Sequence, residues 1–264
     1  MEKIQKIYNE DCIPGMKKLD NDSADIIICD PPYNIGKDFG NDSDKQDFEN
    51  YLNWCDEWIK ECIRILKPNG TLYIYGFSEI LSFIRVRINI NVKWIIWHYT
   101  NKVTPSLNFW QRTHESILVC YKNKPVFNRD DVREPYTDSY LKNAAGKKRA
   151  ATKGRFSNGE KETVYSAHPN GALPRDVIKI SALAGGAGKK ERVDHPTQKP
   201  LELCNKLILA SKNGENTLLV VPFAGSGSEC VAAKKLNINY IGYEINENYV
   251  NLCNDRISGV VADT

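Results

Sequence analysis

The sequence has no long hydrophobic run, and no stretch approaches the roughly 18 consecutive apolar residues of a membrane-spanning helix. The first residues, Met1-Glu2-Lys3, also lack the apolar core of a secretory signal peptide. Hydrophobic residues make up 41% and charged residues 26% of the 264-residue chain, which is ordinary for a globular protein. We therefore expect an intracellular, cytoplasmic protein with no membrane partner.

No Cys-x-x-Cys pair is present, although the chain contains eight cysteines. Without paired spacing, a disulfide framework or a zinc site is the less favoured explanation. The cysteines lie mostly inside apolar patterns, where a reduced thiol behaves as a small hydrophobic side chain. We predict no bound metal and buried free thiols at Cys12, Cys29, Cys55, Cys62, Cys120, Cys204, Cys230 and Cys253.

The chain also lacks a phosphate-binding P-loop. The stretch GGAGKK at residues 185–190 has no leading glycine at the required spacing, no Ser or Thr after the lysines and no preceding strand. A nucleotide site of that type is therefore excluded.

The chain has no net positive charge outside its middle segment. Residues 122–199 contain 17 Lys and Arg against 9 Asp and Glu, whereas the remainder contains 19 against 24. A basic segment on a mildly acidic protein indicates a polyanionic partner. A solvated, lysine-rich loop explains the charge equally well.

Strand and helix patterns alternate in both outer parts of the chain, which predicts an α/β fold with a parallel sheet. Between them, periodicity fades and Lys, Arg, Gly, Asn and Ser dominate, which indicates a loop-rich insertion. We predict one core in two halves, residues 1–122 and 195–264, separated by an insertion at 123–194. The predicted strands are 24–30, 71–76, 92–99, 116–122, 216–221 and 239–244, and the predicted helices are 48–66, 80–88, 201–212, 227–236 and 246–257.

The stretch VVPFAGSGSE at residues 220–229 reads as a strand followed by Gly225-x-Gly227 at the start of a helix. Small residues at such a turn let the backbone approach a nucleotide-type ligand. Glu244 follows Gly225 by 19 positions, at the end of the next predicted strand, where an acid can hold both ribose hydroxyls. The pattern predicts a pocket for an adenosine-containing cofactor; the alternative is a tight turn with no ligand.

The stretch ADIIICDPPYNIG at residues 24–36 ends an apolar strand with Asp30-Pro31-Pro32-Tyr33. At the carboxyl end of a strand, Asp30 and the Pro31 carbonyl offer two acceptors, Pro32 fixes the turn and Tyr33 presents a flat face. Two acceptors beside an aromatic face match an exocyclic amine on a planar base. They would orient the nitrogen lone pair toward an electrophile. A proline-rich turn capped by Asp30 is the structural alternative.

DPPYNIG together with PFAGSGS resembles the S-adenosylmethionine-dependent DNA amino-methyltransferases, which modify adenine N6 or cytosine N4. The order of the motifs resembles the β subgroup, in which the catalytic motif precedes the target-recognition region and the cofactor motif follows. The resemblance covers nearly the whole chain outside the central basic segment. It implies a Rossmann-like methyltransferase sheet with helices on both faces, a circularly permuted motif order and a basic insertion for target recognition.

The resemblance also assigns roles to particular residues. The catalytic tetrapeptide would be Asp30, Pro31, Pro32 and Tyr33. The cofactor-binding residues would be Asp11, Cys12, Asp30, Thr197, Lys199, Phe223, Ala224, Gly225, Ser226, Gly227 and Glu244. An Asp before a short helix, such as Asp11, is also an ordinary cap.

In the central segment, Arg149, Lys153 and Arg155 beside Phe156 form the most DNA-like cluster, although each also suits a solvated loop. The stretch RTHESILVCYK at 112–122 resembles the strand that precedes the recognition region. It would bring Glu115 and His114 near the base, and a structural role suits His114 equally well.

One position departs from the family pattern. An Asp commonly stands two positions before the Phe of the cofactor loop, and here that position is Val221. The substitution removes one polar partner near the methionine end of the cofactor.

We predict methyl transfer from S-adenosylmethionine to adenine N6 in double-stranded DNA, in restriction–modification or orphan modification. Adenine is favoured because cytosine-N4 enzymes more often begin the tetrapeptide with Ser. The absence of a Pro-Cys dipeptide agrees with a reaction that needs no covalent intermediate. The resemblance also allows a cognate restriction endonuclease, a homodimer and association with the nucleoid.

Four alternatives stay open. The first is cytosine N4, and the second is the same chemistry on RNA or a protein amide. The third is a DNA-binding relative with impaired catalysis, which Val221 supports. The fourth is a nucleotide-dependent oxidoreductase, which Asp30-Pro31-Pro32-Tyr33 argues against.

Overall fold

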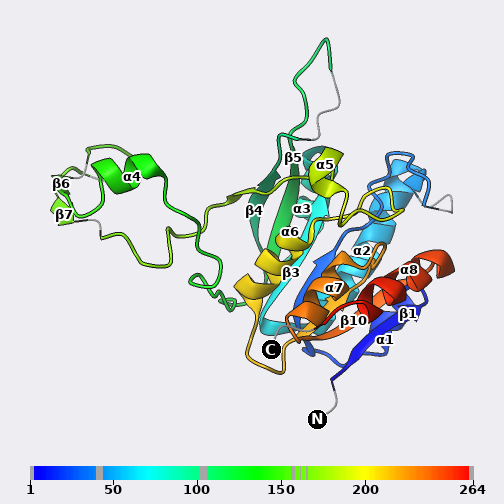
Figure 1. Cartoon of the computed structure of the whole chain (residues 1–264). Helices are drawn as coiled ribbons and strands as arrows, with labels where there is room; N and C mark the ends of the chain where they lie inside the picture. Colours follow the sequence, from blue (N-terminus) through cyan, green and yellow to red (C-terminus); the bar gives the residue numbers. More distant parts are fainter. Residues whose placement is uncertain are drawn as a thin grey trace. The chain divides into compact units, whose positions relative to one another are not determined.

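The computed structural model describes residues 3–39, 44–101, 106–150, 152–155, 158–160, 162–164 and 166–261. The chain divides into two compact units. The larger unit consists of Met1–Phe127 together with Asp176–Thr264, and the smaller unit is Asn128–Arg175. Figure 1 shows the elements of both units.

An eight-stranded sheet forms the centre of the larger unit, in the order β1-β10-β9-β2-β3-β5-β4-β8. Most neighbouring strands are parallel, but β5 runs antiparallel to both β3 and β4. The predicted parallel sheet is therefore present in most of the strands, and it becomes mixed at this edge because β4 and β5 pair as a hairpin. The strands are β1 (Gln5–Asn9), β2 (Ala24–Cys29), β3 (Leu66–Gly76), β4 (Asn91–His98), β5 (His114–Tyr121), β8 (Val177–Lys179), β9 (Leu218–Val221) and β10 (Asn239–Glu244).

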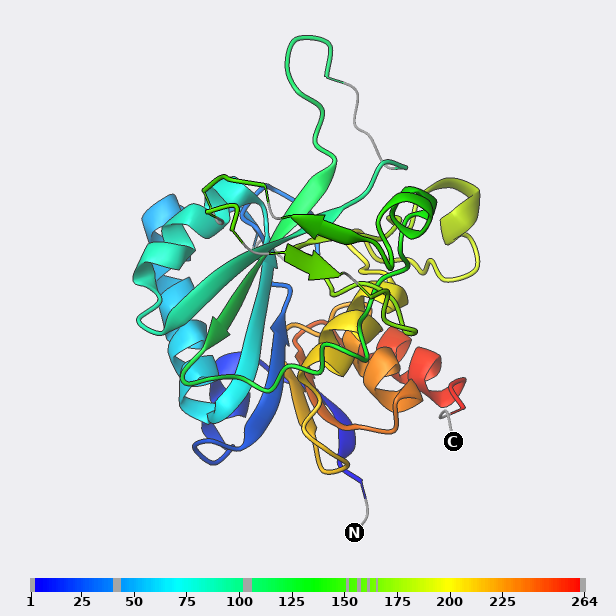
Figure 2. The ribbon, with the colours of Figure 1, turned by 90° about the vertical axis from the view of Figure 1, so that its left-hand side faces the viewer.

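Helices cover both faces of the sheet, as Figure 2 shows. Alternate residues of β2 explain this arrangement, since successive side chains of a strand point to opposite faces. Ile26 and Ile28 pack in one hydrophobic cluster with α6, α7 and α8, while Ile27 and Cys29 pack in the other with α1, α2 and α3. The helices are α1 (Cys12–Lys17), α2 (Phe48–Ile65), α3 (Ser78–Arg87), α6 (Leu201–Ser211), α7 (Ser228–Lys235) and α8 (Glu247–Ser258).

Helix α2 shows how the local sequence determines where an element begins and ends. Asp47 caps its first turn by accepting hydrogen bonds from the amides of Glu49 and Asn50, at 3.1 and 3.3 Å. The helix ends at Ile65, and β3 begins at Leu66. The predicted helix is thus confirmed, but β3 starts five residues before the predicted strand because Lys67 to Gly70 continue the extended backbone.

The boundaries of the insertion differ from the predicted ones. Residues 123–127 and 176–194 lie in the larger unit, because β8 pairs with β4 and the Trp97 indole donates to the Ile180 carbonyl at 2.8 Å. This part also contains the short helix α5 (Gly185–Gly188). The smaller unit contains α4 (Asp138–Asn143) and the antiparallel strands β6 (Lys148–Ala150) and β7 (Glu162–Val164).

All eight cysteines are buried and free, which confirms the prediction of reduced thiols. Among the described residues, no group of three or more His, Cys, Asp and Glu side chains is arranged to hold a metal ion. Within the same part of the chain, no helix is both long enough and apolar enough to cross a membrane.

Candidate active site

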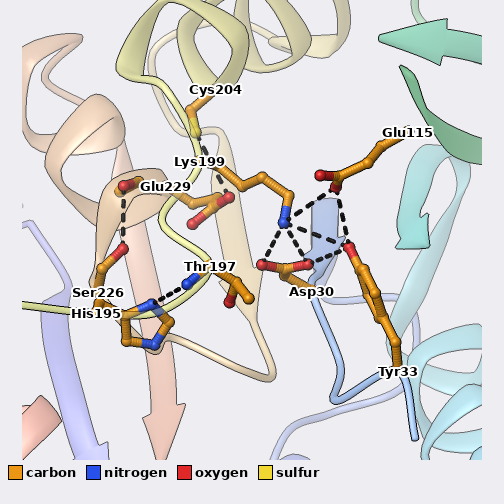
Figure 3. A network of polar contacts seen from close by, with 10 residues as sticks. Asp30, Tyr33, Glu115, His195, Thr197, Lys199, Cys204, Ser226 and Glu229 are labelled. Atoms are coloured by element: carbon orange, nitrogen blue, oxygen red, sulfur yellow. Dashed lines mark hydrogen bonds and ion pairs between the residues drawn. The ribbon is translucent and has the colours of Figure 1, made fainter. Parts of the chain in front are cut away.

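Asp30 lies at the centre of a buried polar cluster, on the turn that follows β2. The Lys199 ammonium contacts both Asp30 carboxylate oxygens at 2.7 Å, and the Tyr33 hydroxyl donates to Asp30 Oδ1 at 2.7 Å (Figure 3). Lys199 precedes α6 and stands 169 positions after Asp30 in the chain. The fold therefore joins two sequence motifs at one carboxylate.

Glu115, at the start of β5, completes this cluster. Its Oε2 atom lies 3.5 Å from Lys199 Nζ and 3.4 Å from the Tyr33 hydroxyl. Burial alone would lower the pKa of Lys199, but the carboxylates of Asp30 and Glu115 outweigh burial and raise it. Burial and the same two carboxylates raise the pKa of Tyr33. Lys199 is therefore charged and Tyr33 is protonated at neutral pH.

The turn after β2 is fixed by side chains from outside the motif. The Tyr51 hydroxyl in α2 donates to the Pro32 carbonyl at 2.9 Å. Asp44, which is only 1% exposed, accepts hydrogen bonds from the backbone amides of Asn34, Ile35 and Lys37. Asn34 has a φ of 57°. These contacts hold the carboxyl end of β2 open, and no described residue donates to the Pro31 carbonyl.

The segment HPTQKP, residues 195–200, lies across from this turn. Gln198 fixes the segment, since its side chain accepts from the Val193 amide at 2.8 Å and donates to the Glu191 carbonyl at 2.9 Å. The Thr197 amide donates to His195 Nδ1 at 3.3 Å. Burial lowers the pKa of His195 to about 4, so its ring is neutral at neutral pH.

The Gly225-Ser226-Gly227 turn requires its glycines. Gly225 has a φ of +49°, and a Cβ atom there would lie 2.9 Å from His195 Nε2. Gly227 has a φ of +74°, and a Cβ there would lie 2.8 Å from Cys253 Sγ. Glu244 at the end of β10 accepts from the Gly225 amide at 2.8 Å and the Asn246 amide at 2.9 Å. The turn and the acid thus form one unit, as their spacing predicted.

A cleft of about 820 Å³, open to solvent, lies between this turn and Asp30. Asp11, Cys12, Thr197, Lys199 and Glu244 are among its lining residues. Asp11 also caps α1 by accepting from the Ile13 amide at 2.8 Å, so both predicted roles are compatible. The other predicted cofactor residues in the lining are Asp30, Phe223, Ala224, Gly225 and Ser226; Gly227 lies just behind it as the N-cap of α7.

The walls of this cleft are rich in aromatic side chains, which suit a planar adenine ring. The aromatic lining residues are Phe39, Trp54, Phe223, Tyr243 and Tyr249.

A second pocket, of about 900 Å³, lies on the other side of Lys199. Its lining includes four aromatic side chains and Glu115, and it shares His195, Thr197 and Lys199 with the cleft. The aromatic residues are Tyr33, Phe77, Trp97 and Tyr99. The two pockets therefore share Lys199, whose partner Asp30 lines the first and whose partner Glu115 lines the second.

Three carboxylates of the site were not predicted from the sequence, namely Glu10, Asp44 and Glu229. Asp44 lies in a polar stretch with no periodicity, and Glu229 lies inside the predicted helix that follows the glycine turn. Glu229 is only 4% exposed and lines the cleft. A glutamate placed directly after GSGS is the signal that could have drawn attention to it.

Comparisons with known proteins identify the family of the chain. The sequence model of the DNA methylase family of N6 and N4 methyltransferases matches residues 24–255. The chain belongs to this family. The methyltransferase is 33% identical to the type II methyltransferase M.HpaI of Haemophilus parainfluenzae over 96% of this chain and 74% of M.HpaI. It is 30% identical to the DNA adenine methyltransferase YhdJ of Escherichia coli K12, over 93% of this chain and 80% of YhdJ.

Solved structures agree with the fold. The complex of M1.HpyAVI with S-adenosylmethionine matches with a TM-score of 0.60 at 25% identity, covering 96% of this chain and 98% of that one. The cytosine-N4-specific PvuII DNA methyltransferase matches with a TM-score of 0.68 at 15% identity, over 97% and 86% of the two chains. The predicted Rossmann-like methyltransferase fold and the family are therefore confirmed.

S-adenosylmethionine is the cofactor of this methyltransferase family. Its sulfonium makes one methyl group electrophilic. The residues of the cleft suit this molecule, because Glu244 stands where an acid can bind ribose hydroxyls, and aromatic side chains and Asp30 are in the same lining. Val221, the position of the missing family Asp, is buried at the end of β9 and offers no polar group.

The predicted DNA-binding residues lie in the smaller unit. Lys153 and Arg155 are exposed and form no ion pair with any described residue. Arg149 has its backbone in β6, but its side chain lies outside the described part, and Phe156 lies outside the described residues. Their role in DNA binding stays a prediction.

Proposed function

We propose that the protein methylates N6 of adenine at a specific site in double-stranded DNA, as a restriction–modification or an orphan modification enzyme. The observation that carries this proposal is the position of Asp30, which lines the cleft and contacts Tyr33 and Lys199 of the aromatic pocket. Adenine rather than cytosine is supported by the first residue of Asp30-Pro31-Pro32-Tyr33. The similarity to YhdJ, a DNA adenine methyltransferase by name, supports the same choice.

Asp30 and Pro31 would hold the two hydrogens of the target amine. Each carboxylate oxygen has about two lone-pair directions, so Asp30 can accept from the amine while it remains paired with Lys199. Held in this way, the N6 lone pair points toward the cleft. The N–C bond would form as the S–C bond breaks, the electron pair would stay on sulfur in the departing S-adenosylhomocysteine, and N6 would release one proton to water. No covalent enzyme intermediate is required. Positioning supplies most of the rate.

The second pocket would receive the target base after it leaves the duplex, since N6 is inaccessible inside the stack. Tyr33 and Phe77 meet edge to face with ring centroids 5.1 Å apart, and Trp97 and Tyr99 meet at 4.9 Å. Because Tyr33 is anchored to Asp30, a base stacked on this wall would have its amine beside the carboxylate.

Duplex binding would use surfaces in both units. Residues 128–175 contain ten Lys and Arg and six Asp and Glu, which favours phosphate contacts. In the larger unit, the segment between β4 and β5 exposes Leu107, Phe109 and Trp110, at 96%, 78% and 89%. Apolar side chains of this kind can insert between base steps. We propose residues 123–194 as the target-recognition region.

Nucleoside mass spectrometry tests the proposal. Unmethylated duplex DNA is incubated with S-adenosylmethionine and the wild-type protein, the Asp30→Asn variant or the matched control Asp56→Asn, which alters an exposed carboxylate of α2. We expect N6-methyladenine from the wild type and control and none from Asp30→Asn. N4-methylcytosine would instead establish the cytosine alternative. Modification of RNA but not DNA, or unchanged activity in Asp30→Asn, would refute the proposal.

A further inference from the structure

Five carboxylates of the described chain line the cofactor cleft, and four of them have strong polar partners. Each of these four accepts from a lysine or from backbone amides. The fifth, Glu229, accepts a hydrogen bond from the Cys204 thiol at 3.5 Å and from its own amide. The four are Glu10 with Lys18, Asp11 with the Ile13 amide, Asp30 with Lys199 and Glu244 with the Gly225 amide.

Glu229 is an unusual group because it is 96% buried and still lines the cleft. A thiol is a weak donor, so it compensates little for the hydration that a carboxylate loses on burial. Burial, assisted by Asp30, raises the pKa of Glu229 to about 7, although Lys199 and Cys204 act in the opposite direction. The group is therefore close to half ionised at neutral pH, and a cationic ligand would hold it ionised.

We propose that Glu229 binds the ammonium group of the methionine part of S-adenosylmethionine. This cofactor has two cationic groups. The sulfonium must lie near Asp30, where the amine is held. The ammonium is joined to it by a short chain, and it needs its own acceptor on the same wall. Figure 3 places the Glu229 carboxylate beside Lys199 and Thr197, on the side away from Glu115.

This assignment explains how the chain tolerates Val221. The family Asp is absent at Val221, and the hydrocarbon side chain there is buried in the core. Glu229, at the start of α7 directly after the glycine turn, supplies a carboxylate to the same βα unit from a different position. The inference depends on the cofactor and is independent of whether the target base is adenine or cytosine.

Two ligands separate the ammonium contact from the rest of the cofactor site. S-adenosylhomocysteine carries the amino acid part, whereas 5′-methylthioadenosine shares the adenosine and sulfur but lacks it. We expect Glu229→Gln to weaken S-adenosylhomocysteine about tenfold or more in calorimetric titrations and to leave 5′-methylthioadenosine within about twofold. The matched control Glu202→Gln, an exposed carboxylate of α6, should change neither.

Equal losses of affinity for both ligands would show a structural role for Glu229. Unchanged affinity for both ligands would show that Glu229 has no role in binding. Either result overturns the proposal. A wild-type protein that binds neither ligand would also overturn it, together with the cofactor assignment. Failure of DNA methylation alone would affect only the proposed function.

The pH dependence of binding provides a second readout. The titratable groups that interact with Glu229 are Asp30, Lys199, Cys204, Tyr75, Cys230 and Cys253. Because the ligand-free carboxyl is protonated below about pH 7, wild-type affinity for S-adenosylhomocysteine should fall by up to tenfold per pH unit as the pH drops from 7 to 5. Glu229→Gln should lack this fall, since the other groups are unchanged. The same pH profile in both proteins would contradict the assignment.

Discussion

Lys199→Met removes the only cation of a buried cluster and leaves the carboxylates of Asp30 and Glu115 facing each other. Lys199 is 3% exposed, while Asp30 and Glu115 are 15% and 14% exposed. Breaking a buried ion pair from one side costs about 3–5 kcal/mol. Because both carboxylates retain some contact with water, we expect the lower end, about 3 kcal/mol.

Urea unfolding followed by tryptophan fluorescence measures this loss. Asp30→Asn should cost less, about 1–2 kcal/mol, because Lys199 keeps Glu115 as a partner. In the double variant, the loss of unfolding free energy should be smaller than the sum of the two single losses by about 1–3 kcal/mol. Lys18→Met, which breaks an exposed pair with Glu10, serves as control and should cost about 1 kcal/mol or less. Additive losses, or a Lys199→Met protein as stable as the control, would refute this reasoning.

Gly225→Ala places a Cβ against His195 at a φ of +49°. In thermal unfolding, the free energy of unfolding should therefore fall by about 1–3 kcal/mol, and adding His195→Ala should restore part of it. Glu244→Gln should weaken S-adenosylhomocysteine and 5′-methylthioadenosine equally, by about tenfold in calorimetry, because both carry the ribose; unequal losses would contradict its role. Tyr33→Phe keeps the ring and loses the 2.7 Å bond to Asp30, so steady-state methylation should fall less than in Tyr33→Ala, and equal loss in both would exclude stacking.

The two ends of the site were visible in the sequence because each follows a strongly apolar strand. Ile26 to Cys29 form a short, continuous apolar run, which is typical of a strand buried on both faces of a sheet. Asp30 was therefore expected at the end of that strand. The same argument placed Gly225 after β9 and Glu244 after β10. Strand ends in such a sheet share one edge, and this made a single site predictable.

The partners of these residues were not predictable from periodicity. Lys199 lies in a short irregular segment, and nothing in its surroundings indicates that its ammonium reaches Asp30. The antiparallel direction of β5, which brings Glu115 into the cluster, depends on hairpin pairing with β4 across residues 99–113. Strand patterns predict burial but not direction, so the alternation of strands and helices predicts a parallel sheet and does not indicate the antiparallel β5.

The charges of the cluster relate its parts to the reaction. Asp30, Glu115 and Glu229 bring three carboxyl groups around the single ammonium of Lys199, and His195 is neutral because burial lowers its pKa to about 4. Once Glu229 is ionised, the negative charge of these three carboxylates exceeds the positive charge of Lys199. Such a site favours a ligand with a sulfonium and an ammonium. Methyl transfer removes the sulfonium charge and leaves the ammonium, so the attraction that binds the cofactor weakens for its product at the step when the product must leave.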